Sequence, residues 1–160
     1  MFNGTISSMR RKDREITDRS VMESILNSAD VCRIALADEN EPYIVPVCFA
    51  YEDNTIYFHS APAGKKIAML TKNPRCSVEV DRSSGPIKSD NPCKWEMQYQ
   101  SVICTGTARI LTGYAEKCAA MNAIMRHYGS KDHPFTEKEL ENVCLVKVLL
   151  GGMTGKSYGY

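Results

Sequence analysis

The sequence alternates between short apolar runs and polar turns over most of its length. Runs rich in β-branched and aromatic residues, bounded by Asp, Asn, Gly and Pro, are typical of strands joined by hairpins. The pattern predicts six strands, at 31–37, 42–51, 55–59, 76–80, 95–111 and 143–150. Because few helices separate these segments, we expect a mainly β protein, a closed or split antiparallel barrel with peripheral helices.

Helical periodicity is confined to four shorter segments. They are 20–27, 64–72, 116–128 and a short helix that opens at 136–139. Ser20 and Thr136 each precede a glutamate by three residues, which is the spacing of a capping box. Asn73-Pro74 is expected to end the second helix, and Gly129 is expected to end the third.

Three features interrupt the strand pattern. Pro46 lies inside 42–51 and cannot donate to a strand ladder, so we expect an edge, a bulge or a gap there. Gly106 predicts a bulge or bend within 95–111. Residues 81–94 contain Ser-Ser-Gly-Pro and Asp-Asn-Pro and are predicted to form a long loop, of a kind that often carries function.

The chain is expected to form a single domain over residues 1–160, which is long enough to bury a substantial core. Residues 1–16 are predicted to be a mixed-charge N-terminal arm, and residues 151–160 a Gly-rich C-terminal tail. The start of the chain lacks the basic residues and apolar run of a signal peptide.

Composition narrows the function classes. Apolar residues make up 43% and charged residues 24%, as in an ordinary soluble domain. A net charge of +1 lacks the basic excess of a nucleic-acid binder, and no apolar run could span a membrane, so we expect neither partner. Seven cysteines without C-x-x-C spacing fit neither a zinc site nor a disulfide scaffold and favour a cytoplasmic location.

The best candidate for chemistry is the segment 56–66. An apolar strand ends in His59-Ser60, turns through Ala-Pro-Ala-Gly, and leads into a helix that starts with Lys65 and Lys66. Backbone N–H groups and the partial positive charge of a helix start favour an anion, and lysine side chains suit phosphate. The alternative is a solvated helix start whose lysines face water.

The other two histidines are weaker candidates. His127 ends a helix and His133 lies in a polar loop, so both are expected to be solvated or capping groups. His59 differs because it ends an apolar strand beside the candidate anion site. The three share no H-x-x-H spacing, and no metal site is expected.

Several motifs in a fixed order resemble the pyridoxamine 5′-phosphate oxidase-like, FMN-binding split-barrel superfamily, and most closely its nitroimidazole-resistance branch. The resemblance runs from about Met9 to Lys156. The motifs are 42–51, Ile56–Ser60, Gly64-Lys65-Lys66, Asn73-Pro74, Tyr99–Gly106, Glu116-Lys117 and Thr154-Gly155-Lys156. Residues 81–94 match no pattern of this family.

The resemblance implies a six-stranded FMN-binding split barrel that forms a homodimer, with two FMN sites at the subunit interface. Four residues would bind the phosphate: His59, Ser60, Lys65 and Lys66. Backbone groups of Val45, Pro46 and Val47 would line the isoalloxazine ring. Ser101 and Val102 would approach the flavin from the partner chain, and His59 is the catalytic candidate. FMN is expected in preference to FAD or haem.

We therefore expect an FMN-dependent oxidoreductase. It would take electrons from NAD(P)H or another donor and pass them to a small organic acceptor, such as a nitro compound. His59 could supply a proton because histidine titrates near neutral pH. Two alternatives remain: a flavin- or nucleotide-binding carrier, store or sensor without turnover, and a haem- or deazaflavin-binding member of the same fold.

Overall fold

The structure is a computed structural model and describes residues 9–160; residues 1–8 of the predicted N-terminal arm lie outside the described residues. Its strands are β1 (Glu15–Ile16), β2 (Cys32–Asp38), β3 (Glu41–Val47), β4 (Phe49–Glu52), β5 (Thr55–Ser60), β6 (Arg75–Ile87), β7 (Glu96–Ile110) and β8 (Cys144–Tyr158). The α-helices are α1 (Arg19–Asn27), α2 (Lys65–Lys72), α3 (Tyr114–His127) and α4 (Glu137–Leu140). Two 3₁₀ turns, η1 (Lys12–Arg14) and η2 (Pro92–Lys94), complete the elements.

The strands form one antiparallel sheet with the order β3-β2-β6-β7-β8-β5-β4, and β1 pairs with β8. The prediction of a mainly β, antiparallel fold with peripheral helices is confirmed. The predicted number of six strands is wrong, because the described residues contain eight. Two-residue β1 is too short to leave a periodic pattern, and the predicted strand 42–51 is divided at Cys48 into β3 and β4.

The division at Cys48 makes the sheet a split barrel. β3 and β4 lie at opposite ends of the sheet order, yet a single residue separates them in the chain. Consecutive Cα atoms are about 3.8 Å apart, so the sheet must curl until its two ends almost meet. At this seam the Phe49 N–H donates to the Tyr128 hydroxyl at 3.0 Å, and that hydroxyl donates to the Asp30 carbonyl at 2.6 Å.

The inside of the barrel is the main core. Fully buried side chains from β2, β5, β6 and β7, among them Ile34, Phe58, Val78 and Val102, pack there against α1 and α2. Burial raises the pKa of the Cys32 thiol to about 12, so this cysteine stays protonated and packs as a small apolar residue.

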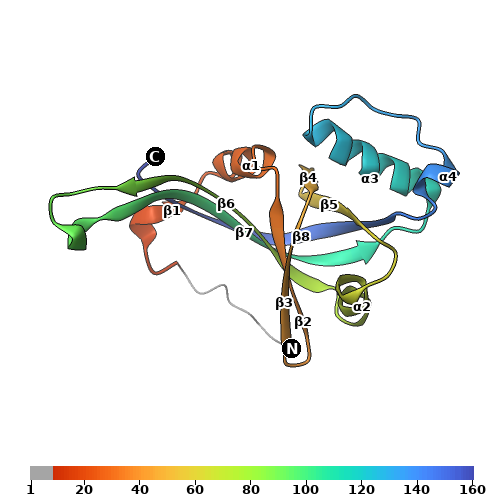
Figure 1. Ribbon diagram of the computed structural model, residues 1–160, viewed down its shortest axis with the longest axis horizontal. Coiled ribbons are helices and arrows are strands. Elements are labelled where there is room, and N and C mark those ends of the chain that lie inside the picture. Colours follow the sequence, from red (N-terminus) through yellow and green to blue (C-terminus); the bar gives the residue numbers. More distant parts are fainter. Residues whose placement is uncertain (1–8) are drawn as a thin grey trace.

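A second, smaller apolar cluster lies outside the barrel. It joins α3 and α4 to the outer surface of β4, β5 and β8 through buried residues such as Ala123, Leu140 and Leu145. Figure 1 shows α1 and α3 above the sheet in that view and α2 below it. Within residues 9–160, no helix covers the rest of the outer surface of the sheet.

The predictions of irregular structure for two segments are wrong. Residues 81–94 do not form a long loop, because β6 continues to Ile87 and pairs with β7 as far as Glu96. Figure 1 shows this pair as a long arm that ends in the green turn. The predicted tail 151–160 belongs mostly to β8, which pairs with β7 as far as Tyr158. Backbone pairing overrode the local turn signals, which are Gly, Ser and Pro in 81–94 and Gly and Ser in 151–160.

Most of the predicted helix ends are confirmed. Thr136 and Glu139 form the predicted capping box, and Asn73 ends α2. The cap of α1 is Asp18 instead of Ser20: its side chain accepts from the Ser20 N–H at 2.8 Å. Within residues 9–160, no helix has both the length and the apolar character needed to cross a membrane.

The bulge predicted at Gly106 is confirmed, because the register between β7 and β8 shifts between Thr105 and Gly106. A Cβ on Gly106 would lie 2.7 Å from the Leu149 carbonyl oxygen, which is backbone and cannot turn away. Gly106→Ala should therefore lower the free energy of unfolding by about 1–3 kcal/mol in urea titrations. Gly151→Ala, where the nearest atom is 3.9 Å away, is the control and should change it little.

Candidate functional site

The start of α2 has no side-chain cap. Gly64 precedes the helix with φ of +127°, a conformation that side chains rarely adopt, and no side chain caps the first turn. The first N–H groups of a helix lack partners within the helix and carry partial positive charge. They are therefore left available at a point where two lysines follow.

The two lysines have different surroundings. Lys65 is exposed, with its Nζ 2.5 Å from Glu41 Oε1 and 4.8 Å from the centre of the Tyr43 ring. Lys66 is half-buried, with its Nζ 5.4 Å from the centre of the Phe58 ring, and has no carboxylate partner among residues 9–160. Burial lowers the pKa of Lys66. A cation held away from water without a counter-charge favours a bound anion.

Ser60 lies on the same side of β5 as this lysine. Side chains two residues apart on a strand share a face, so Ser60 points as Phe58 does, toward the barrel interior. Ser60 is half-buried and pairs with Cys144 of β8. The strand end, the turn and the helix start thus bring Ser60 and Lys66 to one side, as an anion site requires.

His59 points the other way. It pairs with Leu145, a buried member of the cluster beneath α3, and shares a face of β5 with Tyr57, which packs on that cluster. Its side chain is exposed on the α3 side, whereas Ser60 faces the barrel. The structure therefore does not bring the His59 ring to the start of α2, and its catalytic role stays a prediction.

The segment Val45-Pro46-Val47 lies on β3, the last strand at its end of the sheet. One of the alternatives predicted for Pro46, an edge strand, is what the structure has. Val45 and Val47 face the core and Pro46 is exposed, paired with Arg33. An edge strand presents one row of backbone N–H and C=O groups to a ligand or partner.

Ser101 and Val102 lie far from this edge within one chain. They belong to β7, three strands from β3 in the sheet order. At about 4.8 Å per strand the separation is roughly 14 Å. The Val102 side chain is fully buried, so only its backbone could contact a ligand, while Ser101 is half-buried on the outer face between Asp81 and Lys156.

The remaining histidines have structural surroundings. His127 Nε2 lies 2.8 Å from the Ala29 carbonyl oxygen, and its ring packs on Phe49 at 5.0 Å between centres. His133 is exposed and lies 3.4 Å from a Glu139 carboxylate oxygen. Across residues 9–160, no three side chains of His, Cys, Asp or Glu gather closely enough to hold a metal ion.

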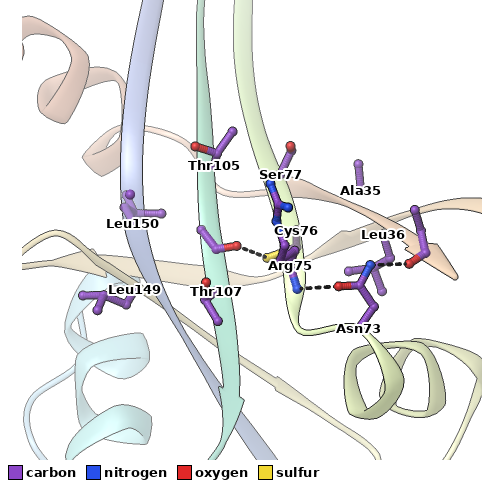
Figure 2. Close-up of a pocket in the computed structure, with 13 residues that line it drawn as sticks. Ala35, Leu36, Asn73, Arg75, Cys76, Ser77, Thr105, Thr107, Leu149 and Leu150 are labelled. Carbon is purple, nitrogen blue, oxygen red and sulfur yellow. Dashed lines mark hydrogen bonds between the residues drawn. The ribbon is translucent and has the colours of Figure 1, made fainter. Parts of the chain in front are cut away.

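The part of the outer face that no helix of residues 9–160 covers contains a hollow of about 610 Å³, away from the start of α2. Figure 2 shows its floor, where Ala35, Ser77 and Thr105 lie on three neighbouring strands. The strand register puts these small residues in one row that runs from Ile44 on β3 to Gly152 on β8. The hollow exists because short side chains meet in this row.

Three exposed large apolar side chains lie on the same outer face as this hollow. Ile44 is 61% exposed, Leu149 60% and Ile103 48%, although each is a large side chain that favours burial. They lie on β3, β8 and β7 of the same outer face. Large apolar side chains gathered on an uncovered sheet face are typical of a protein interaction surface.

Sequence reasoning missed the partners of Lys65 and this outer face. Glu41 and Tyr43 flank the Pro42 motif, but nothing in the sequence shows that α2 returns beside them. The row from Ile44 to Gly152 joins residues up to about a hundred positions apart, which only strand order brings together. Alternation could have suggested that Ile44, Ile103 and Leu149 are exposed.

The fold and the helix start together define a class: split barrels in which an edge strand meets an uncapped, lysine-bearing helix. The family model for pyridoxamine 5′-phosphate oxidase matches residues 18–157. This chain therefore belongs to the pyridoxamine 5′-phosphate oxidase family.

Solved structures agree with this family. A candidate 5-nitroimidazole antibiotic resistance protein from Bacteroides thetaiotaomicron is 36% identical, with a TM-score of 0.78 over 89% of this chain and 85% of that chain. The flavocytochrome Anf3 from Azotobacter vinelandii has a TM-score of 0.83 at 17% identity, over 95% of this chain and 72% of that one. At that identity the likeness shows the fold alone.

Two further relatives are similar. A FAD-binding protein from Mesorhizobium loti is 24% identical, with a TM-score of 0.67 over 91% of this chain and 98% of that one. An uncharacterised protein of Rhizobium meliloti is 28% identical over 91 residues, 57% of this chain. The match spans about half, 53%, of that curated relative's length.

The lowered pKa of Lys66 predicts a measurable cost of the site in the ligand-free protein. Burial opposes the charged lysine, so Lys66→Met should raise the free energy of unfolding by about 0.5–1 kcal/mol near pH 7. The gain should shrink as pH rises through the lowered pKa of the folded state, because the neutral lysine loses the penalty. Urea titrations from pH 7 up through this pKa measure the difference in the free energy of unfolding.

Lys65→Met is the matched control, since Lys65 is exposed and already paired with Glu41. It should give no gain at any pH. An equal gain from both variants would show that removing positive charge in general, and not the burial of Lys66, stabilises the protein.

Proposed function

We propose that this protein is a cytoplasmic, homodimeric FMN-binding oxidoreductase that passes electrons from NAD(P)H to a small organic acceptor, such as a nitro compound. The observation that carries the proposal is the half-buried Lys66, without a carboxylate partner in the described chain, beside the uncapped start of α2. Family membership and the 36% identity to the candidate nitroimidazole-resistance protein support the flavin and the acceptor.

The residues at this site fit the phosphate of FMN. The first N–H groups of α2, Lys66 and the Ser60 hydroxyl supply donors and positive charge where a phosphate would bind. The free edge of β3 along Val45 to Val47 offers backbone groups to the polar rim of a flat ring. Bound flavin supplies reversible two-electron transfer, and the chain binds and orients it.

The proposed reaction balances in electrons and protons. The nicotinamide nucleotide gives up two electrons and one proton, and a second proton comes from solvent. The nitro group accepts both electrons and both protons, becomes a nitroso group and releases water. His59 could deliver a proton only to an acceptor that reaches the α3 side of β5, because its side chain faces that side.

The positions of the proposed contacts support a homodimer. Ser101 and the β3 edge are roughly 14 Å apart within one chain, too far to close on the same ring from both sides. A second copy packed on the outer face would bring its own Ser101 and Val102 backbone to the β3 edge. The exposed Ile44, Ile103 and Leu149 support such packing.

A second candidate function is a flavin carrier, store or sensor without turnover. The orientation of His59 favours it, because no histidine side chain in the described chain faces the start of α2. FAD and haem remain alternative cofactors, since solved members of this fold include a FAD-binding protein and a flavocytochrome. The cytoplasmic location rests on seven cysteines whose spacing suits a reducing compartment.

Purified protein should be yellow with the two-band spectrum of a flavin, and a Soret band would instead indicate haem.

FMN affinity, measured by quenching of flavin fluorescence, should fall about tenfold or more in Lys66→Met, since a charge-assisted contact is lost. Unchanged FMN binding in this variant would contradict the phosphate assignment.

Reoxidation kinetics separate an enzyme from a carrier. The protein is first reduced anaerobically with NAD(P)H and then mixed with a nitroimidazole. Only an enzyme is reoxidised faster with the acceptor than without it.

The dimer is tested on the outer face. Leu149→Lys should shift the protein from dimer to monomer in size-exclusion chromatography with light scattering, and FMN affinity should fall with it. Because Leu149 is 60% exposed, the Leu149→Lys protein should fold normally. Val21→Lys, on the exposed side of α1, is the control and should remain dimeric. A Leu149→Lys protein that stays dimeric at micromolar concentration would place the interface elsewhere.

A further inference from the structure

The first lysine of α2, Lys65, already forms an ion pair with a carboxylate. Lys65 Nζ lies 2.5 Å from a Glu41 carboxylate oxygen and above the Tyr43 ring. Glu41 and Tyr43 belong to the start of β3, so this contact joins the start of α2 to the β2–β3 hairpin. Lys66, the next residue, has no such partner in the part of the chain that the structure describes.

A second contact of the same kind lies at the other end of α2. Lys72 Nζ is 2.7 Å from Asp38 Oδ2, and the Asn73 side-chain amide donates to the Ala37 carbonyl at 2.9 Å. Both ion pairs thus tie α2 to the β2–β3 hairpin. Lys65 lies where the helix N–H groups are free, whereas Lys72 lies at the end whose partial charge is negative.

We infer that Glu41 controls the affinity of the site for a phosphate-bearing flavin by competing with the phosphate for Lys65. This rests on the proposed function. A phosphate at the start of α2 either draws Lys65 away from Glu41, which breaks an ion pair, or shares the ammonium with it. A lysine has three donors and can bridge two acceptors, but sharing brings a carboxylate close to a phosphate of like charge.

Both routes change the affinity for phosphate in the same direction. Breaking the pair and holding two anions near one ammonium each oppose phosphate binding, so Glu41 lowers affinity in either case. The effect is limited because Lys65 and Glu41 are both largely exposed, and water and salt weaken interactions between exposed charges. Glu41 is therefore a residue that tunes affinity without being required for the fold, since the Lys72–Asp38 pair and the Asn73 contact still hold α2.

Riboflavin gives the sharpest comparison because it differs from FMN only in lacking the phosphate. Dissociation constants for both flavins can be measured by fluorescence quenching at low ionic strength, on the wild type, Glu41→Gln and Asp38→Asn. Glu41→Gln should bind FMN about threefold to tenfold more tightly than the wild type and bind riboflavin equally well. Asp38→Asn removes the other ion pair and should match the wild type for both flavins.

The salt dependence gives a second readout. The advantage of Glu41→Gln for FMN should shrink at about 0.5 M salt, because exposed charges are then screened. If Glu41→Gln binds FMN no more tightly than a wild type that does bind it, the role of Glu41 is wrong and the proposed function stands. If the affinities for FMN and riboflavin change alike, Glu41 acts through the fold and the inference also fails. If the wild type binds neither flavin, the proposed function fails and takes the inference with it.

Discussion

The seam at Cys48 is the constraint on which the rest of the structure depends. One residue separates the two strands at opposite ends of the sheet, so the sheet must curl into a barrel. The seam has no strand pairing to close it. Instead the Tyr128 hydroxyl bridges the Phe49 N–H and the Asp30 carbonyl, and burial raises the pKa of this phenol to about 12. A protonated tyrosine can therefore donate and accept at once.

The open seam also explains where a ligand could bind. A closed barrel would pair both edges of β3, whereas the split leaves one edge free beside the lysine-bearing start of α2. The same curling exposes an outer face with a row of small residues from Ala35 to Thr105, flanked by Ile44 and Gly152, and exposed Leu149 lies on the same face. In residues 9–160 of one chain, both the free strand edge and this apolar face are left without a covering element.

The start of α2 lowers stability when no anion is bound. An uncapped helix start and a half-buried lysine without an acidic partner each cost free energy in the absence of an anion. Side chains cap α1 and α4, as Asp18 and Thr136 do, whereas the first turns of α2 and α3 have no side-chain cap. The start of α2 differs from that of α3 because its first turn has no acidic residue and carries Lys66, so an anion would supply the missing interactions. Glu41 offsets part of the excess charge through Lys65 and leaves Lys66 for a ligand.

The sequence by itself determined the local structure and the chemistry available at the site. Strand alternation, the Thr136 capping box, the Asn73-Pro74 stop and the Gly106 bulge depend on neighbouring residues, so local patterns predicted them. The order of motifs predicted the family, and the lysines after Gly64 predicted an anion site at a helix start.

Only the tertiary structure decided how these pieces meet. The long β6–β7 arm and the C-terminal part of β8 contain turn-forming residues, and pairing between distant strands overrode them. The division at Cys48 is set by sheet closure and leaves no mark in an apolar run. Likewise strand alternation puts His59 and Ser60 on opposite faces of β5, but only the packing of α3 and of the barrel core shows which face each residue takes. The partner of Lys65 depends on α2 returning beside β3. Each of these depends on contacts between residues far apart in the chain, which a local pattern does not encode.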